Sequence, residues 1–379
     1  MAARRSATKR FETGWSGPML AGMSLTLPID CDVHPVLPGL PALMPYLDDM
    51  WREQVVRRGI DELYSISFPS NAPITTRADW KGADGRTATT PELLAAQGMD
   101  PFGTGTAILH CLYGVQLPFS EDMGAVFTRA LNDWIVAEWL DRDPRLRASI
   151  VVPVQSPALA VAEIERLAHD RRFVSVLLLV MGETPLGRRQ HWPIYEAAER
   201  QGLSLAIHAG SSYRNPPSPL GWTSYYTEEY VNQANAFQTQ LTSLVCEGVF
   251  SKFPTLKVVL LESGFTWLPG YLWRLEKFWK GVRMEVPWVD RPPGEIVRDR
   301  VRFSLQPIDA PPDSDDMLRL MDHMKSDELL VFSTDYPHWQ FDGQEVLPTC
   351  FSPELVRKIT VDNPLNAFPR LKTLRESVP

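Results

Sequence analysis

The sequence of 379 residues predicts an α/β fold, a (β/α)8 barrel of the TIM type with a long insertion after the first strand. Three observations support this prediction. Short apolar runs alternate with longer amphipathic stretches, eight such runs occur, and several of them end in a histidine or a carboxylate. A doubly wound open sheet is the alternative that strand–helix alternation alone also allows.

The eight apolar runs are predicted to be parallel strands that are buried on both faces. Such strands read as short, nearly continuous hydrophobic segments rather than as strict alternation. The runs are Leu25–His34, Thr106–Leu112, Arg147–Val154, Phe173–Met181, Leu203–Ala209, Leu256–Glu262, Val301–Pro307 and Leu329–Asp335.

Seven amphipathic stretches between these runs are predicted to be helices. Residues 121–140 carry apolar side chains at a 3.6-residue spacing. Ser156 followed by Pro157 is typical of a helix start, and Gly202 of a helix end. The predicted helices are Glu121–Leu140, Pro157–His169, Trp192–Gln201, Glu228–Phe250, Trp267–Lys280, Ser314–Lys325 and Pro353–Ile359.

The domain organisation follows from these elements and from composition. With 44% hydrophobic residues, the chain is long enough to bury a large core. We expect residues 1–22 to be a flexible N-terminal arm and residues 23–379 to be a single barrel domain. Within that domain, residues 35–105 are rich in proline, glycine and charge and are expected to form an insertion or cap.

Charge and cysteine content limit the classes of partner. The net charge is −8, and no basic run occurs beyond the N-terminus, which argues against nucleic acid. The four cysteines are far apart and contain no CxxC pair, which indicates a reducing compartment. No apolar run is long enough to cross a bilayer. We therefore expect a cytoplasmic protein that acts on a small molecule.

Polar side chains at the strand ends predict a metal site, because the functional groups of a barrel lie at the carboxyl ends of its strands. Asp32 and His34 are two residues apart at the end of the first run and so face the same side. His208 lies in the fifth run and Asp335 ends the eighth. Two histidines and two carboxylates suit one divalent ion of zinc, manganese or iron. Each residue alone also fits an ordinary cap or loop residue.

Five further residues are candidates for the same site. His110, near the end of the second run, and Glu262, at the end of the sixth, are candidate acid or base groups, partners of the ligands or additional ligands. His338 and Trp339 lie in an aromatic-rich turn that forms either a substrate wall or the closure of the barrel. His191 either faces the same end of the barrel or packs on the following tryptophan.

In this order along the chain, these motifs resemble the amidohydrolase superfamily. The segments are Asp-x-His in the first strand, AIHAG in the fifth, LLESGFTWLPGYLWRLEK from the sixth, FSTDYPHWQFDG from the eighth and the closing TVDNPLNAF. The resemblance is to the amidohydrolase-2 branch, which includes aminocarboxymuconate-semialdehyde decarboxylase and resorcylate-type decarboxylases. It extends from about Leu25 to Phe368.

The resemblance implies a barrel that binds one divalent metal, commonly zinc or manganese. Its ligands would be Asp32, His34, His208 and Asp335. The family's arginine in the helix after strand six falls on Arg274, which would anchor a substrate carboxylate or pair with an acidic neighbour. Relatives often self-associate, so a homodimer or higher homo-oligomer is possible for this chain.

Two departures from the family pattern affect the expected reaction. The first ligand is an aspartate, where this branch often has histidine and several decarboxylases have glutamate. The family's decarboxylases carry a catalytic histidine at the end of strand six, where this chain has Glu262. A carboxylate is a better base or ligand than a proton donor, so this departure argues against decarboxylation.

The sequence therefore favours a metal-dependent hydrolase that acts on a small organic substrate, aromatic or carboxylate-bearing. A metal ion, zinc in first place and manganese or iron as alternatives, would activate a water molecule. Asp335 would accept the proton of that water, and Glu262 or His110 would protonate the leaving group. One alternative is non-oxidative decarboxylation of an aromatic or enol acid. The other is a non-catalytic barrel that has kept the scaffold.

Overall fold

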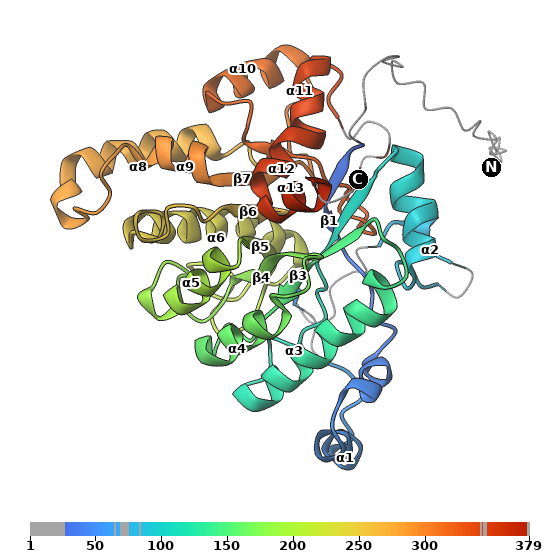
Figure 1. The fold of residues 1–379 in the computed structure, drawn as a ribbon. Helices are drawn as coiled ribbons and strands as arrows, with labels where there is room; N and C mark the ends of the chain where they lie inside the picture. Colours follow the sequence, from blue (N-terminus) through green and yellow to red (C-terminus); the bar gives the residue numbers. More distant parts are fainter. Residues whose placement is uncertain are drawn as a thin grey trace, which may run out of the picture.

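The computed structural model describes residues 27–63, 66–68, 76–82, 85–341, 343 and 347–376, with side chains described up to residue 372. Eight parallel strands follow one another in sequence order around a barrel (Figure 1). The predicted (β/α)8 barrel is confirmed, and each predicted apolar run overlaps one strand. The strands are β1 (Ile29–Val33), β2 (Thr106–Leu109), β3 (Leu146–Val151), β4 (Phe173–Met181), β5 (Ser204–Ser211), β6 (Val258–Leu261), β7 (Val301–Ser304) and β8 (Leu330–Val331).

The chain that follows β8 closes the barrel against β1. The backbone N–H of His34 donates to the carbonyl of Tyr336 at 2.7 Å, and that of Asp335 donates to the carbonyl of Asp32 at 3.1 Å. These bonds join the two segments that carry three of the predicted metal ligands. Residues from the two ends of the sequence are thereby held side by side.

Helices surround the strands on the outside (Figure 1). Side-chain caps account for some of their starts, as where the backbone N–H of Met123 donates to the hydroxyl of Ser120 at 3.3 Å. The helices that match predicted ones are α3 (Glu121–Ile135), α4 (Pro157–Leu167), α5 (Trp192–Arg200), α6 (Tyr226–Cys246), α8 (Leu268–Val282), α10 (Ser314–Met324) and α11 (Pro353–Arg357).

Three of the predicted helices change character before they end. Val136–Leu140 continues α3 as a π-helical turn, and Lys358–Asp362 continues α11 in the same way. The predicted helix Glu228–Phe250 ends early, and a short helix α7 (Val249–Lys252) follows it. Gly248 lies between the two with a φ of 82°, a left-handed conformation that interrupts a right-handed helix.

Several helices were not predicted. In the insertion between β1 and β2, the structure has α1 (Asp49–Arg58) and α2 (Pro91–Leu94), together with short turns of 3-10 and π-helix. The ring of Trp80 lies 4.8 Å from that of Tyr336, so part of the insertion packs on the turn after β8. The other unpredicted helices are α9 (Pro293–Arg300), α12 (Asn363–Ala367) and α13 (Pro369–Glu376).

Two further expectations concern the N-terminal arm and membrane-spanning helices. The predicted N-terminal arm, residues 1–22, lies outside the described residues. Among the described helices, none combines the length and the hydropathy that a membrane span requires.

Candidate metal centre

The four predicted ligands converge at the carboxyl end of the barrel. Asp32 lies in β1 with His34 directly after it, and His208 lies in β5. Asp335 lies in the turn that follows β8. Glu262 directly follows β6 and joins the same group, and all five side chains are buried. The strands therefore deliver their polar ends to one place, as a parallel barrel requires.

The donor atoms are close enough to share one ion. His34 Nε2 lies 3.0 Å from Asp335 Oδ1 and 3.4 Å from Asp32 Oδ1. His208 Nε2 lies 3.9 Å from Asp32 Oδ2. The atoms of Asp32, His34 and His208 lie within 4.8 Å of one another, as do those of a second set in which His34 joins Glu262, Asp335 and His338. Ligands at about 2 Å from a common ion would have such separations.

Hydrogen bonds fix the orientation of both histidine rings. His34 Nδ1 lies 2.9 Å from the backbone carbonyl of His110, and His208 Nδ1 lies 2.6 Å from that of Ala209. A carbonyl only accepts, so each Nδ1 carries a hydrogen, and each Nε2 faces the centre, where it can bind a metal once it has lost any proton. This is the arrangement by which metal-binding histidines are usually held.

Several buried polar atoms at the centre lack a hydrogen-bond partner among the described residues. They are both carboxylate oxygens of Asp32, Oδ2 of Asp335 and Nε2 of His208. Burying a charged group without a partner is strongly unfavourable. A divalent cation would satisfy all four atoms, and the mixture of carboxylate and imidazole is a common donor set for such ions. The residues present therefore fit a metal.

The electrostatics of the centre also indicate that a cation belongs there. Burial raises the pKa of Asp335 to about 8, and the charge of Glu262 adds to the effect. Burial lowers the pKa of His208, but Glu262 and Asp32 outweigh this and raise that pKa to about 9. Among the described residues, only histidines lie within 4 Å of these carboxylates as possible cations. Without a metal, imidazoles must therefore balance the negative charge.

Two of the residues that carry these carboxylates have a left-handed backbone conformation. Glu262 has a φ of 54° and Asp335 a φ of 55°, both in the left-handed region that non-glycine residues seldom adopt. The backbone N–H of Glu262 donates to the hydroxyl of Ser304 at 2.9 Å, which helps to hold it. Such conformations concentrate at functional sites, where the surrounding structure enforces them.

Asp30 is a member of the centre that the sequence analysis did not single out. Its Oδ2 accepts from the hydroxyl of Thr334 at 2.6 Å, and its Oδ1 accepts from the backbone N–H groups of Thr334 and Asp32, at 3.1 and 3.2 Å. Asp30 therefore holds β1 and the segment before Asp335 in register. The signal in the sequence is a third polar residue at the same alternation, Asp30-x-Asp32-x-His34.

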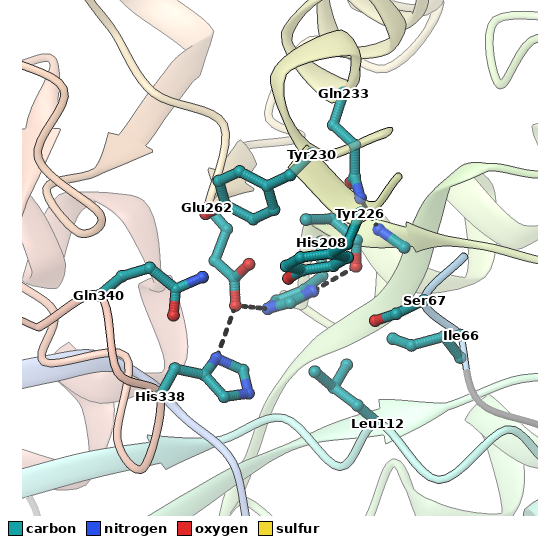
Figure 2. Close-up of a pocket in the computed structure, with 12 residues that line it drawn as sticks. Ile66, Ser67, Leu112, His208, Tyr226, Tyr230, Gln233, Glu262, His338 and Gln340 are labelled. Atoms are coloured by element: carbon teal, nitrogen blue, oxygen red, sulfur yellow. Dashed lines mark hydrogen bonds and ion pairs between the residues drawn. The ribbon is translucent and has the colours of Figure 1, made fainter. Parts of the chain in front are cut away.

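A pocket of about 190 Å³ opens over His208, Glu262 and His338 (Figure 2). Tyr226 and Tyr230 of α6 form part of its wall. A cavity of about 150 Å³ is enough for one benzene molecule, so the pocket has room for a single substituted ring. The rest of the wall includes Ile66, Leu112, Gln233 and Gln340.

His338 was predicted as a substrate contact, and the structure places it in the centre itself. Its Nδ1 lies 2.7 Å from Asp335 Oδ1 and 3.0 Å from Glu262 Oε1. Burial opposes its charge, but Asp335 and Glu262 outweigh this and raise the pKa of His338 well above its ordinary value. Figure 2 shows its other ring nitrogen on the side of the ring away from Glu262.

His110, expected to be an acid or base, lies beneath the centre. Its Nε2 is 3.0 Å from the carbonyl of Cys31, and its Nδ1 is 2.8 Å from the hydroxyl of Ser149. Both ring nitrogens thus contact the barrel interior, and His110 is not among the described residues that line the pocket. Its backbone carbonyl, rather than its ring, contacts His34.

Three expected substrate contacts lie elsewhere. Arg274 is exposed on α8, with its guanidinium 5.0 Å from the ring of Phe278. His191 is buried beside α5, and its Nε2 lies 3.0 Å from the hydroxyl of Thr184. Trp339 is 58% exposed. Among the described residues, the pocket lining includes none of the three, because α8 and α5 lie outside the barrel and Trp339 turns to solvent.

Several known proteins resemble this chain in sequence or in structure. A gamma-resorcylate decarboxylase of Polaromonas sp. (strain JS666 / ATCC BAA-500) is 27% identical over 197 residues, which are 47% of this chain and 57% of that protein. The chain thus spans little more than half of this relative.

Two solved structures share the fold over nearly their whole length. An amidohydrolase from Mycobacterium avium subsp. paratuberculosis K-10 has a TM-score of 0.66 at 20% identity, with 90% of this chain and 97% of that chain covered. A dihydroxybenzoic acid decarboxylase from Polaromonas sp. JS666, solved with manganese and the inhibitor 2-nitroresorcinol, has a TM-score of 0.61 at 18% identity, with 91% and 97% covered.

The family match covers most of the chain. The sequence profile of the amidohydrolase-2 family, described as Amidohydrolase, matches residues 29–370. This range begins at β1 and includes every residue of the candidate centre. The protein therefore belongs to the amidohydrolase-2 family.

Proposed function

We propose that this protein is a metal-dependent decarboxylase that releases CO₂ from a small aromatic acid without a redox step. The observation that carries the proposal is the position of His338, an imidazole at the floor of the pocket beside the four predicted ligands. The decarboxylases among the relatives and the solved structures support the same reaction.

This proposal replaces hydrolysis as the first choice. Hydrolysis was favoured because strand six ends in Glu262, where a proton-donating histidine was expected. His338 supplies an imidazole from the turn after β8 instead, and Glu262 accepts a hydrogen bond from it at 3.0 Å. The departure at strand six therefore no longer argues against decarboxylation.

Asp32, His34, His208 and Asp335 are the residues that would hold the metal. When bound, a divalent cation supplies positive charge that attracts the substrate carboxylate and stabilises negative charge as it develops. Manganese becomes the first choice over zinc and iron, because a decarboxylase of similar fold contains it. His110 is assigned a positioning role, through the carbonyl that orients His34.

The chain's own residues account for the transfer of the proton. As the bond between the ring carbon and the carboxylate breaks, its electron pair stays on the ring carbon, and CO₂ leaves. His338 donates the proton on Nε2 to that carbon and later regains one from solvent. Its Nδ1–H stays bonded to Asp335 and Glu262, which keep the ring oriented. Tyr226 and Tyr230 line the wall beside the ring of the substrate.

The test is CO₂ release from monocyclic hydroxybenzoic acids by the protein loaded with Mn²⁺. We expect a phenolic product that carries one deuterium at the former carboxyl position when the reaction runs in D₂O. His338→Gln should lower kcat by at least about 100-fold, which is the low end of the effect of a general acid. Its content of metal should not change.

His323→Gln provides the matched control, because His323 is an exposed histidine of α10 remote from the pocket. This variant should keep the activity of the wild type. Cleavage of esters, lactones or amides in the absence of any CO₂ release would overturn the proposal, and so would full decarboxylase activity in His338→Gln.

A further inference from the structure

The structure assigns Glu262 as a fifth ligand of the metal ion, which gives the centre a third carboxylate and a preference for six-coordinate cations such as Mn²⁺ over Zn²⁺. This inference rests on the metal centre of the proposed function but not on the reaction. The four ligands that the resemblance implies do not include this residue.

Distances to the other donor atoms place Glu262 in the ligand set. Its Oε1 lies 3.2 Å from His208 Nε2 and 3.7 Å from His34 Nε2. Donor atoms about 2.1 Å from one octahedral ion are about 3.0 Å apart when adjacent and about 4.2 Å apart when opposite. Both separations fall in this range, as does the 3.0 Å between His34 Nε2 and Asp335 Oδ1.

The buried Nε2 of His208 gives a second observation. It has no hydrogen-bond partner among the described residues, although Oε1 of Glu262 is only 3.2 Å away. A buried nitrogen and a carboxylate oxygen at this separation can be adjacent ligands of one ion. A shared ion would therefore satisfy both atoms.

The charge of the centre also calls for a cation at Glu262. Histidine ligands must be neutral to bind a metal, so in the loaded protein His34 and His208 cannot balance charge. One protonated His338 then faces three carboxylates, those of Asp32, Glu262 and Asp335, and a net negative charge remains for the ion to balance. Among the described residues, no lysine or arginine forms an ion pair with Glu262. A third carboxylate beside Asp32 and Asp335 adds hard oxygen ligands, which favour manganese-type octahedral sites over tetrahedral zinc.

The competing interpretation is that Glu262 only orients His338, whose Nδ1 lies 3.0 Å from Oε1. The two roles differ in one countable property, the number of water molecules on the ion. Five protein ligands leave one position of an octahedral ion for water, whereas four leave two.

The experiment measures the relaxation of water protons by Mn²⁺ bound to the full-length protein without substrate. We expect the contribution of metal-bound water to about double in Glu262→Ala, as a second water enters. Under competition between Mn²⁺ and Zn²⁺, the bound ratio should shift toward zinc in this variant. His338→Gln, which changes the neighbour of Glu262, should leave the number of waters unchanged.

Glu262→Gln serves as a second variant of nearly the same shape in case Glu262→Ala does not fold. Loss of a partner that only orients ligands costs about 10–100-fold in metal affinity, so a ligand should cost more than about 100-fold for Mn²⁺. An unchanged number of waters in Glu262→Ala, or a smaller loss of affinity in Glu262→Gln, would overturn the inference. Neither result would affect CO₂ release by the wild type, which tests the proposed function separately.

Discussion

At the scale of single residues, the centre is a set of buried charges whose positions depend on a few hydrogen bonds. Asp30 shows this most clearly, because it is fully buried and its hydrogen bonds among the described residues go to β1 and to the segment before Asp335. Its alternation with Asp32 and His34 was visible in the sequence. Its role was not, because that role depends on Thr334, which lies at the other end of the chain.

Asp30→Asn should therefore weaken metal binding without removing a ligand. The amide keeps one oxygen and loses the second acceptor, so Thr334 and the neighbouring Asp335 are held less firmly. We expect the affinity for Mn²⁺ to fall by about 10–100-fold. Calorimetric titration of the metal-free protein measures this.

Thr334→Val breaks the same hydrogen bond from the other side. It removes the hydroxyl that donates to Asp30 and keeps the volume of the side chain. It should weaken Mn²⁺ binding in the same direction. Wild-type affinity in both variants would contradict the positioning role of Asp30.

At the scale of elements, the apolar runs predicted all eight strands, because strands covered on both faces are hydrophobic over most of their length. Helix α9 escaped prediction because only Ile296 and Val297 of its central residues are apolar and buried, too few to form a periodic stripe. The place of His338 also escaped, since the left-handed Asp335 redirects the chain after β8. No local pattern in the sequence reports that turn.

Helix α6 carries a titratable group behind the pocket wall. Glu229 is fully buried, its Oε1 accepts from Gln233 Nε2 at 2.8 Å, and its Oε2 has no hydrogen-bond partner among the described residues. Burial raises its pKa from 4.5 to about 7. The folded protein therefore binds this proton more tightly than the unfolded chain does.

Glu229→Gln should remove a dependence of stability on pH. In the wild type, the raised pKa makes the unfolding free energy fall as the pH rises from about 4.5 to about 7. The variant should thus be more stable than the wild type at pH 8 by on the order of 1–3 kcal/mol, and the gain should vanish near pH 4.5. Denaturant unfolding at both pH values measures the difference.

Glu196→Gln on α5 is the control for this change, since Glu196 is an exposed glutamate. Its stability should follow that of the wild type across the same range. A gain in Glu229→Gln that is equal at both pH values would mean that packing, and not charge, is responsible.

At the scale of the whole molecule, the barrel explains why residues far apart in the sequence form one centre. The parallel order from β1 to β8 brings every strand end to the same face, and the bonds between β1 and the segment after β8 complete the ring. The convergence of the four proposed ligands was predictable because each lies in or just after an apolar run. The pocket wall was harder to predict, because its residues from α6 show no sequence pattern other than the periodicity of a helix.

The central claim is that Asp32, His34, His208 and Asp335 bind one divalent ion. Elemental analysis of the wild type and of the double variant His208→Ala/Asp335→Asn, both after reconstitution with Mn²⁺ and removal of free metal, tests it most directly. The account predicts about one ion per chain in the wild type and almost none in the folded double variant. Equal metal content in the two proteins, or no metal in the wild type, would contradict it.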